Sequence, residues 1–434
     1  MKVDSLKKVY FIGIGGIGIS AVAKMFFDKG IKVLGSDSSS SIVTDKLKEF
    51  GIQIYDEHKK ENIDRDVDLV IYTVAIKEDN PELLQAKNFG IKTLTYAESL
   101  GLISENMETV AISGTHGKTT TTAMIAKVMI DNNFDPTVIV GSLLNKEKSN
   151  LVVGKSKYFI VEACEYKRSF LNLNPKILII NNIDEDHLDY YKDLEDIKSA
   201  FRELAEKVKD DGYVLYNSND KNSLEVVSNL KCNLIDYSKF IDNNITLNVP
   251  GKHNKSNAGV VLALSEILHI DRNKTIKSLS SFSGTWRRSE FKGKTKNGCM
   301  LYDDYAHHPK EVSSTLSGFR EIYKDKKIVV FFQPHLFSRT KILFKEFGKC
   351  FSDSNLVYVL PIFKAREDFD PSINSEMLSE EINRNKTESL PIENTEKIIE
   401  IISKLDENHI SITVGAGDMY KIYDDQKLKL LLQI

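Results

Sequence analysis

The chain has 434 residues, too many for one ordinary core, and about 150 residues per domain gives two to three domains. Apolar residues make up 41% and charged residues 28%, a composition that excludes wholesale disorder. The 59 basic and 62 acidic side chains leave a net charge of −3, so the chain lacks the basic excess of a dedicated nucleic-acid binder.

The cysteines and the first apolar stretch bear on the compartment. No two of Cys164, Cys232, Cys299 and Cys350 are spaced as C-x-x-C, and scattered thiols in a large chain fit a reducing compartment. Residues 9–23 are uncharged but rich in glycine, no small-residue cleavage site follows them, and they are shorter than the roughly 20 residues that span a bilayer. We therefore expect a cytoplasmic protein without a targeting or membrane segment.

Strand and helix patterns alternate along the chain and restart twice. The predicted strands cover residues 9–12, 32–36, 69–72, 109–113, 158–161, 176–180, 300–302, 327–332, 356–360 and 411–415. The clearest predicted helices cover residues 19–29, 44–50, 81–89 and 119–131. This alternation predicts parallel sheets with crossover helices, and hence an α/β protein of three domains over 1–107, 108–283 and 284–434.

A glycine loop follows the first predicted strand. Gly13, Gly15 and Gly18 fit the pattern G-x-G-x-x-G between a strand and a helix, where backbone can approach a phosphate. Asp37 ends the second strand, where an acid that binds ribose would lie. The loop alone leaves three readings open: an NAD site, a tight structural turn, and a site for a nucleotide diphosphate that is not a redox cofactor.

The second glycine loop indicates ATP more sharply. The sequence from Gly114 to Thr119 follows a strand and opens a helix, although Ile112 replaces the first glycine of a strict P-loop. Backbone N–H groups there can cradle phosphates, Lys118 can reach the β and γ oxygens, and the Thr119 hydroxyl can bind Mg²⁺.

Acidic and imidazole side chains follow the next two strands. Glu162 ends one strand, and residues 181–189 supply asparagine, aspartate and His187 after the other. Because the carboxyl ends of parallel strands meet at one crevice, both segments together favour a Mg²⁺–ATP site. Further polar motifs occur at 250–257, 286–288, 303–309 and 333–340.

Taken in order, these motifs resemble the Mur ligase family of ATP-dependent amide-forming enzymes, and most closely its alanine-adding branch. The resemblance covers the whole chain and includes Gly415 to Asp418 near its end. It implies a Rossmann-like N-terminal domain for a UDP-sugar, a central P-loop domain for ATP, and a C-terminal Rossmann-like domain for the amino acid. The first loop would then face the UDP diphosphate and not NAD.

The resemblance also implies roles for individual residues. The UDP-sugar would contact Gly13, Gly15, Gly16, Ile17, Gly18, Asp37 and Thr73. ATP would contact Gly114, Thr115, His116, Gly117, Lys118, Thr119, Thr120, His253, Asn254, Asn257, Arg288 and Asp304. The metal would be held by Thr119, Glu162 and His187, and the amino acid by Tyr305, His307 and Arg339. The catalytic set would be Lys118, Glu162, His187, His307 and Arg339.

Three departures from the family pattern stand out. Phe201 lies where some branches carry a carbamylated lysine, so we expect no such group. Leu336 replaces a second arginine of many alanine-adding members, which leaves Arg339 or another partner to bind the amino-acid carboxylate. Cys164 and Lys167 replace acidic residues expected after Glu162.

The chemistry implied is transfer of the ATP γ-phosphoryl group to the lactyl carboxylate of UDP-N-acetylmuramate, which gives an acyl phosphate. The amine of L-alanine then attacks, and phosphate leaves. His187, His307 or a phosphate oxygen can accept the amine proton, and the sequence leaves that choice open. The expected substrates are small molecules used in peptidoglycan precursor synthesis, and the expected state is a monomer or weak homodimer.

Four other readings remain. A sibling ligase adds a recycled murein peptide to the same sugar nucleotide, and a folylpolyglutamate-synthetase-like enzyme shares the central domain. An NAD-dependent oxidoreductase would explain only the first loop. A noncatalytic nucleotide-sugar binding protein would show no ATP turnover that depends on both substrates.

Overall fold

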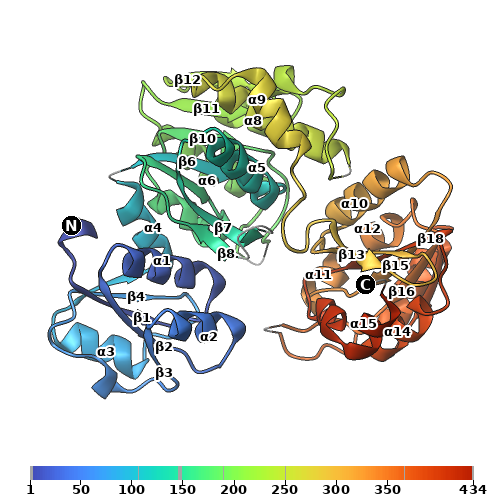
Figure 1. The fold of residues 1–434 in the computed structure, drawn as a ribbon, viewed down its shortest axis with the longest axis horizontal. Coiled ribbons are helices and arrows are strands. Elements are labelled where there is room, and N and C mark those ends of the chain that lie inside the picture. Colours follow the sequence, from blue (N-terminus) through green and yellow to red (C-terminus); the bar gives the residue numbers. More distant parts are fainter. Residues whose placement is uncertain are drawn as a thin grey trace. The chain divides into compact units, whose positions relative to one another are not determined.

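The computed structural model describes residues 3–105, 107–144, 149–188, 190–249, 251–365 and 367–432 (Figure 1). The chain divides into two compact units, one of residues 1–245 with 256–281 and the other of residues 246–255 with 282–434. The division passes through helix α8 (Lys252–Ile267).

The first sheet contains five parallel strands in the order β3-β2-β1-β4-β5. Its strands are β1 (Lys8–Ile12), β2 (Lys32–Ser36), β3 (Gln53–Tyr55), β4 (Leu69–Tyr72) and β5 (Lys92–Thr95). The segments between and after them form α1 (Ile17–Asp28), α2 (Ile42–Glu49), η2 (Lys60–Asn62), α3 (Pro81–Asn88) and α4 (Tyr96–Ser104), and η1 (Val3–Ser5) precedes β1. The central β1 is buried along its whole length, as its apolar run requires.

The second sheet has seven strands in the order β12-β11-β10-β6-β9-β7-β8, and β8 alone among the described pairings is antiparallel. Its strands are β6 (Glu108–Ser113), β7 (Thr137–Leu144), β8 (Ser149–Val152), β9 (Tyr158–Glu162), β10 (Ile177–Ile180), β11 (Tyr213–Tyr216) and β12 (Asn233–Asp236). Its helices are α5 (Lys118–Asp131), η3 (Tyr166–Asn172), α6 (Leu194–Glu206), α7 (Lys221–Val227), η4 (Tyr237–Phe240), α8 and α9 (Arg272–Ser280). The carboxyl ends of β6, β9 and β10 lie side by side, which brings the segments that follow them together.

The third sheet lies in the second unit and has the order β13-β14-β18-β15-β16-β17, with β13 antiparallel to β14. Its strands are β13 (Glu290–Lys294), β14 (Met300–Asp304), β15 (Lys327–Phe332), β16 (Leu356–Val359), β17 (Glu388–Pro391) and β18 (His409–Val414). Its helices are α10 (Pro309–Ile322), α11 (Phe337–Ile342), α12 (Phe344–Lys349), α13 (Ser375–Arg384), α14 (Thr395–Ile402), η5 (Met419–Asp424) and α15 (Gln426–Leu431). Successive residues of β15 enter two different apolar clusters, so both faces of the sheet are covered.

The three α/β sheets confirm the predicted fold class. Every predicted strand is present within a few residues, because each is a buried apolar run. The strands that the sequence did not indicate are mainly short outer ones such as β3, β12 and β17, whose exposed polar residues carry no apolar run. Within the described part of the chain, no helix has the length and apolarity needed to cross a membrane.

Candidate active site

The P-loop is the tight turn from β6 into α5. Gly114 has φ +128° and Gly117 has φ +82°, conformations that other residues rarely adopt. A Cβ at Gly114 would lie 2.9 Å from Cβ of Asn181, and one at Gly117 would lie 2.9 Å from Oδ1 of Asn257. Both glycines are therefore required by backbone geometry and by close neighbours. This turn holds Gly114, Thr115, His116, Gly117, Lys118, Thr119 and Thr120, the seven consecutive residues predicted for ATP.

The segment after β10 clamps this loop. The backbone N–H of His116 donates to Oδ1 of Asn182 at 2.9 Å. The backbone N–H of Asp184 donates to the hydroxyl of Thr115 at 2.9 Å, and that hydroxyl donates to the Asp184 carbonyl at 3.2 Å. Asn182 and Asp184, which the sequence places near the metal, thus fix the shape of the loop.

Lys118 is held against the loop by a buried carboxylate. Its Nζ donates to the carbonyl oxygens of Gly114 at 2.6 Å and Thr115 at 3.2 Å, and lies 2.9 Å from both carboxylate oxygens of Glu165. Burial is the largest single effect and lowers the pKa of Lys118, but the charge and hydrogen bond of Glu165, together with Cys164 and Glu162, raise that pKa above its usual value. The ammonium group therefore stays charged at the N-terminus of α5, where phosphates bind.

Two carboxylates face the first turn of α5: Glu162 ends β9, and Glu165 follows that strand. The Thr119 hydroxyl donates to Oε2 of Glu162 at 3.2 Å, while Oε1 of Glu162 accepts the backbone N–H of Gly141 at 2.8 Å. Nε2 of His187 lies 3.8 Å from carboxylate oxygens of both Glu165 and Asp186. One ligand atom from each of Glu165, Asp186 and His187 lies within 4.8 Å of the others.

Glu165 is the functional candidate that sequence reasoning missed. It lies in the same Glu-Ala-Cys-Glu segment as Glu162, and only 4% of its side chain is exposed. The sequence signal was present, since two acids follow one strand end, but only the backbone path shows that the second acid turns toward Lys118. Phe201 is fully buried and packs edge-on against Phe170, with ring centroids 5.2 Å apart, so no lysine occupies that position.

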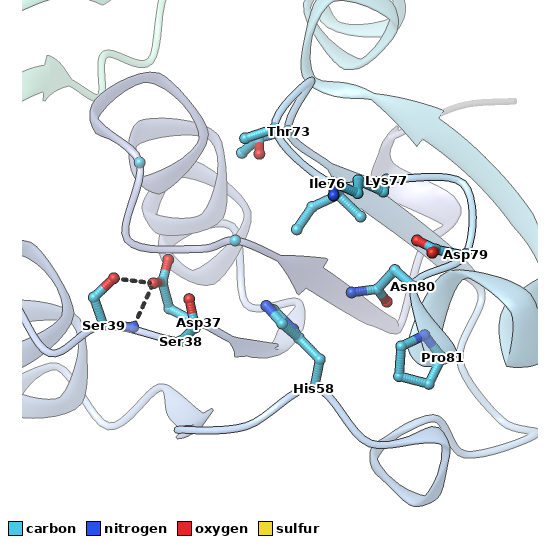
Figure 2. Close-up of a pocket in the computed structure, with 13 residues that line it drawn as sticks. Asp37, Ser38, Ser39, His58, Thr73, Ile76, Lys77, Asp79, Asn80 and Pro81 are labelled. Carbon is cyan, nitrogen blue, oxygen red and sulfur yellow. Dashed lines mark hydrogen bonds between the residues drawn. The ribbon is translucent and has the colours of Figure 1, made fainter. Parts of the chain in front are cut away.

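The first glycine loop borders a cavity of about 620 Å³ in the N-terminal sheet (Figure 2). Of the residues predicted to contact the UDP-sugar, Gly13, Gly16, Asp37 and Thr73 line it. Gly15, Ile17 and Gly18 do not: Ile17 is 44% exposed, and a Cβ at Gly18 would lie 2.7 Å from the ring of Tyr96. The volume is in the range of small-molecule sites.

Asp37 is engaged with its own loop. One carboxylate oxygen accepts the backbone N–H of Gly15 at 2.9 Å, and the other accepts the N–H of Ser39 at 3.0 Å (Figure 2). A Cβ at Gly15 would lie 2.8 Å from that carboxylate. Asp37 therefore shapes the glycine loop in addition to lining the cavity.

In the second unit, His253 and Asn254 begin α8, and Arg288 and Asp304 flank the paired ends of β13 and β14. Burial lowers the pKa of His253, so its imidazole is kept neutral. Oδ2 of Asp304 accepts the N–H of Ser289 at 2.7 Å, and Oδ1 accepts the N–H of Ala306 at 2.8 Å. Asp304 thereby fixes the two turns beside it.

Three rings lie in a row: those of Tyr305 and His307, which follow β14, and that of His335, which follows β15. The ring of Tyr305 lies 5.4 Å from that of His307, which lies 6.2 Å from that of His335, between centroids. The guanidinium of Arg339 reaches Nδ1 of His335 at 3.5 Å and lies on α11. The structure thus brings the three residues predicted for the amino acid together and adds His335, which the sequence left without a role.

Leu336 caps α11 in an unusual backbone conformation. It has φ +71° although it is not glycine, and only 5% of it is exposed. Its backbone N–H donates to the Phe363 carbonyl at 2.9 Å, and its carbonyl accepts the Thr340 hydroxyl at 2.7 Å. The apolar side chain supplies no cation here.

Family models account for most of the chain. Residues 8–107 match the Mur ligase family catalytic domain, residues 112–243 the Mur ligase middle domain, and residues 287–417 the Mur ligase glutamate ligase domain. The chain therefore belongs to the Mur ligase family.

Relatives in that family at 41–43% identity are named UDP-N-acetylmuramate–L-alanine ligase. The chain is 43% identical to the UDP-N-acetylmuramate–L-alanine ligase of Clostridium acetobutylicum, over 97% of this chain and 98% of that protein. It is 41% identical to the enzyme of the same name from Clostridium perfringens, over 96% and 97%. The crystal structure of UDP-N-acetylmuramate-alanine ligase from Thermotoga maritima matches with a TM-score of 0.79 at 30% identity, over 96% of this chain and 97% of that one. A murein peptide ligase from Psychrobacter arcticus, at 20% identity and TM-score 0.67, shares the fold.

Proposed function

We propose that this chain is an ATP-dependent ligase that joins L-alanine to the lactyl carboxylate of UDP-N-acetylmuramate through an acyl phosphate. The products are the amide, ADP and phosphate, and the reaction belongs to peptidoglycan precursor synthesis. The observation that carries the proposal is identity of 41–43% over nearly the whole chain to relatives named for this reaction. The recycling ligase that adds a murein peptide is the second candidate, but its likeness at 20% identity extends to the fold alone.

We assign one substrate to each of the three parts of the chain that carry a sheet. Residues 1–107 bind the UDP-sugar, with Gly13, Gly16, Asp37 and Thr73 lining the cavity. Residues 108–283 bind ATP through the P-loop and Lys118, with Asn257 beside Gly117. Residues 284–434 bind L-alanine through Tyr305, His307 and Arg339, and the nucleotide also contacts His253, Asn254, Arg288 and Asp304.

The residues near the P-loop fit Mg²⁺. The Thr119 hydroxyl and the Glu162 carboxylate are 3.2 Å apart, and Glu165, Asp186 and His187 offer further oxygen and nitrogen ligands. Hydroxyl and carboxylate oxygens are the donors that Mg²⁺ prefers. Bound there, the ion would neutralise charge on the phosphates of ATP.

The lactyl carboxylate and the γ-phosphoryl group of ATP are both negatively charged. Positive charge in the site must therefore offset their repulsion when the acyl phosphate forms. The Lys118 ammonium and the N–H groups at the start of α5 stabilise the γ-phosphoryl group as it transfers. Arg339 binds the carboxylate of L-alanine. His307 accepts the amine proton, because Nδ1 donates to the Tyr305 carbonyl at 3.1 Å and Nε2 is left as the acceptor.

We also propose that the enzyme works in the cytoplasm as a monomer or weak homodimer. The four cysteines are all free, which suits a reducing compartment. The substrates are small molecules, and no nucleic-acid or membrane partner is needed.

The test is phosphate release from Mg²⁺–ATP and UDP-N-acetylmuramate, with L-alanine, glycine, L-serine or the tripeptide added separately. We expect release that requires L-alanine. Release with the peptide alone would instead establish the recycling ligase, and no release with any acceptor would leave a binding protein.

Lys118→Ala is the matching active-site variant. Loss of one preorganised charge should cost at least roughly 3 kcal/mol, or on the order of a hundredfold in kcat/KM. Lys127→Ala is the control, because Lys127 lies on the same helix and forms an i,i+4 ion pair with Asp131. Near-normal kcat/KM in Lys118→Ala would remove Lys118 from the mechanism.

A further inference from the structure

The helix that carries Arg339 has no side-chain cap of its own. α11 is six residues long, and its N-cap residue is Leu336, whose side chain has no acceptor and makes no cap hydrogen bond (Figure 1). The first N–H groups of a helix have no partner within it, and a serine, aspartate or asparagine at the N-cap normally accepts one of them. Helices this short are marginal by themselves. α11 therefore depends on contacts from elsewhere in the fold.

A segment after β16, residues 367–372, supplies the missing acceptor, and we call it the strap. Oε2 of Glu367 accepts the backbone N–H of Ser338 at 3.1 Å, and Oε1 of Glu367 accepts the Ser338 hydroxyl. Ser338 is the second residue of α11, so its N–H is one of those that the helix leaves without a partner. A hydrogen bond to an ionised carboxylate is stronger than one between neutral groups. Glu367 thus caps α11 from outside, in place of Leu336.

The strap holds α11 at two further points. Phe369 packs edge-on against Phe337, with ring centroids 5.6 Å apart. Nζ of Lys341 donates to the Ser372 hydroxyl at 2.8 Å and lies 3.5 Å from Oδ2 of Asp370. Together with the cap, these contacts join the strap to the first, second and fifth residues of the helix.

Arg339 lies on the other side of the helix. At about 3.6 residues per turn, the first, second and fifth residues of α11 share one face, and the third residue lies on the opposite face. That third residue is Arg339, whose guanidinium reaches Nδ1 of His335 at 3.5 Å. The ring of His335 in turn stacks on that of Phe363, with centroids 5.7 Å apart. The strap therefore fixes one face of α11 while the other face presents Arg339 to the row of rings.

We infer that Glu367 is a positioning residue of the amino-acid site: by capping α11 it fixes the place of Arg339, which binds the carboxylate of the incoming amino acid. Glu367 acts through the backbone of the helix and does not touch the substrate. Because the carboxylate stays bound before and during the reaction, a displaced guanidinium weakens binding of the amino acid without slowing the bound complex. The inference rests on the proposed function in taking Arg339 to bind L-alanine.

The experiment is steady-state kinetics of the full chain, with ATP, UDP-N-acetylmuramate and L-alanine varied in turn. Glu367→Ala removes the acceptor and should raise KM for L-alanine by about five- to tenfold, the value of one charge-assisted hydrogen bond that solvent weakens. We expect its kcat and the other two KM values to stay unchanged. Glu367→Gln keeps an acceptor oxygen on a side chain of the same length and should restore most of the affinity for L-alanine.

Asp368→Ala is the matched control. Asp368 carries the same charge as its neighbour Glu367 and is exposed, so its loss should leave KM for L-alanine unchanged. The control separates the cap from a general effect of negative charge on the strap.

The outcomes separate this inference from the proposed function. An unchanged KM for L-alanine in Glu367→Ala overturns the inference. A parallel rise in KM for all three substrates also overturns it, because Glu367 would then support the unit as a whole. A Glu367→Gln variant as impaired as Glu367→Ala would show that charge and not the cap matters. In each case alanine-dependent phosphate release by the wild type still supports the ligase, whereas a wild type without that release contradicts the proposed function itself.

Discussion

The surroundings of His307 favour the neutral imidazole that its proposed role as a base requires. Burial lowers its pKa, Glu311 opposes that effect, and the positive charges of Arg339 and Arg288 add to it. The net direction is downward from the usual value of 6.5. The imidazole therefore stays neutral at neutral pH, with Nε2 available to take a proton.

This direction gives a pH dependence for catalysis. A base whose pKa is lowered stays deprotonated to lower pH, so kcat should fall on the acid side only below about pH 6.5. The measurement is kcat at saturating L-alanine from pH 5 to 9, with His307→Gln expected to lose kcat at every pH and to bind UDP normally. His409→Gln serves as the control. An acid limb centred above pH 6.5 would contradict a buried neutral His307.

At the level of single residues the sequence identified the P-loop well and the carboxylates only in part. Lys118 and Thr119 are set by a contiguous motif, so their positions follow from chain order alone. Glu165 is different, because Glu162 and Glu165 are alike in sequence and only the turn after β9 directs one to Thr119 and the other to Lys118. His58 and Asn80 line the cavity of the first sheet from two separate segments, so chain order alone did not bring them together.

Arg287 joins structural elements of the second unit. Its Nε donates to Oδ2 of Asp303 at 2.8 Å, and its remaining nitrogens donate to the carbonyl oxygens of Gly417 at 3.0 Å and of Gly415. It is 2% exposed, and Asp303 is fully buried. Burial raises the pKa of Asp303, and the charge of Arg287 counteracts that rise. The end of β14 is thereby tied to the loop after β18.

Arg287→Met should destabilise the second unit by about 3–5 kcal/mol, because it leaves the buried Asp303 without its partner. The measurement is the unfolding free energy from denaturant titration. In the double variant Arg287→Met with Asp303→Leu, part of that loss should return, since no unpaired charge remains. If the loss of stability in the double variant equalled the sum of the losses in the two single variants, Arg287 would act through packing alone. The sequence placed Arg287 beside Arg288 in one motif, and only the structure shows that Arg287 is buried whereas Arg288 is half-buried.

Element prediction succeeded where burial governs the pattern. Strands such as β10 and β15 are continuous apolar runs covered on both faces, so the sequence alone locates them. Outer strands such as β17 pair through backbone groups and leave side chains exposed, so their residues carry no distinctive pattern. Leu336 shows a second limit, because a leucine with φ +71° violates the local preference that sequence reasoning uses.

Each of the two units has apolar clusters of its own. One pair of clusters includes Phe11 and Tyr10 in the first unit, and another pair includes Phe332 and Phe331 in the second. None of these four clusters draws members from both units. We therefore expect two unfolding transitions, although α8 continues from one unit into the other.

Ligand binding should separate these transitions. When UDP is present at a hundred times its dissociation constant, binding adds about 2.7 kcal/mol to the free energy of unfolding of the unit that binds it. For a unit of this size, this raises the midpoint of its unfolding transition by roughly 5–10 °C. Because the cavity lies in the first unit, UDP should raise that transition and leave the other unchanged in scanning calorimetry. Arg287→Met identifies the transitions independently, since it should lower only the one that UDP does not raise. If UDP moved both transitions equally, the two units would unfold as one, and their separate cores would not set the cooperativity of the chain.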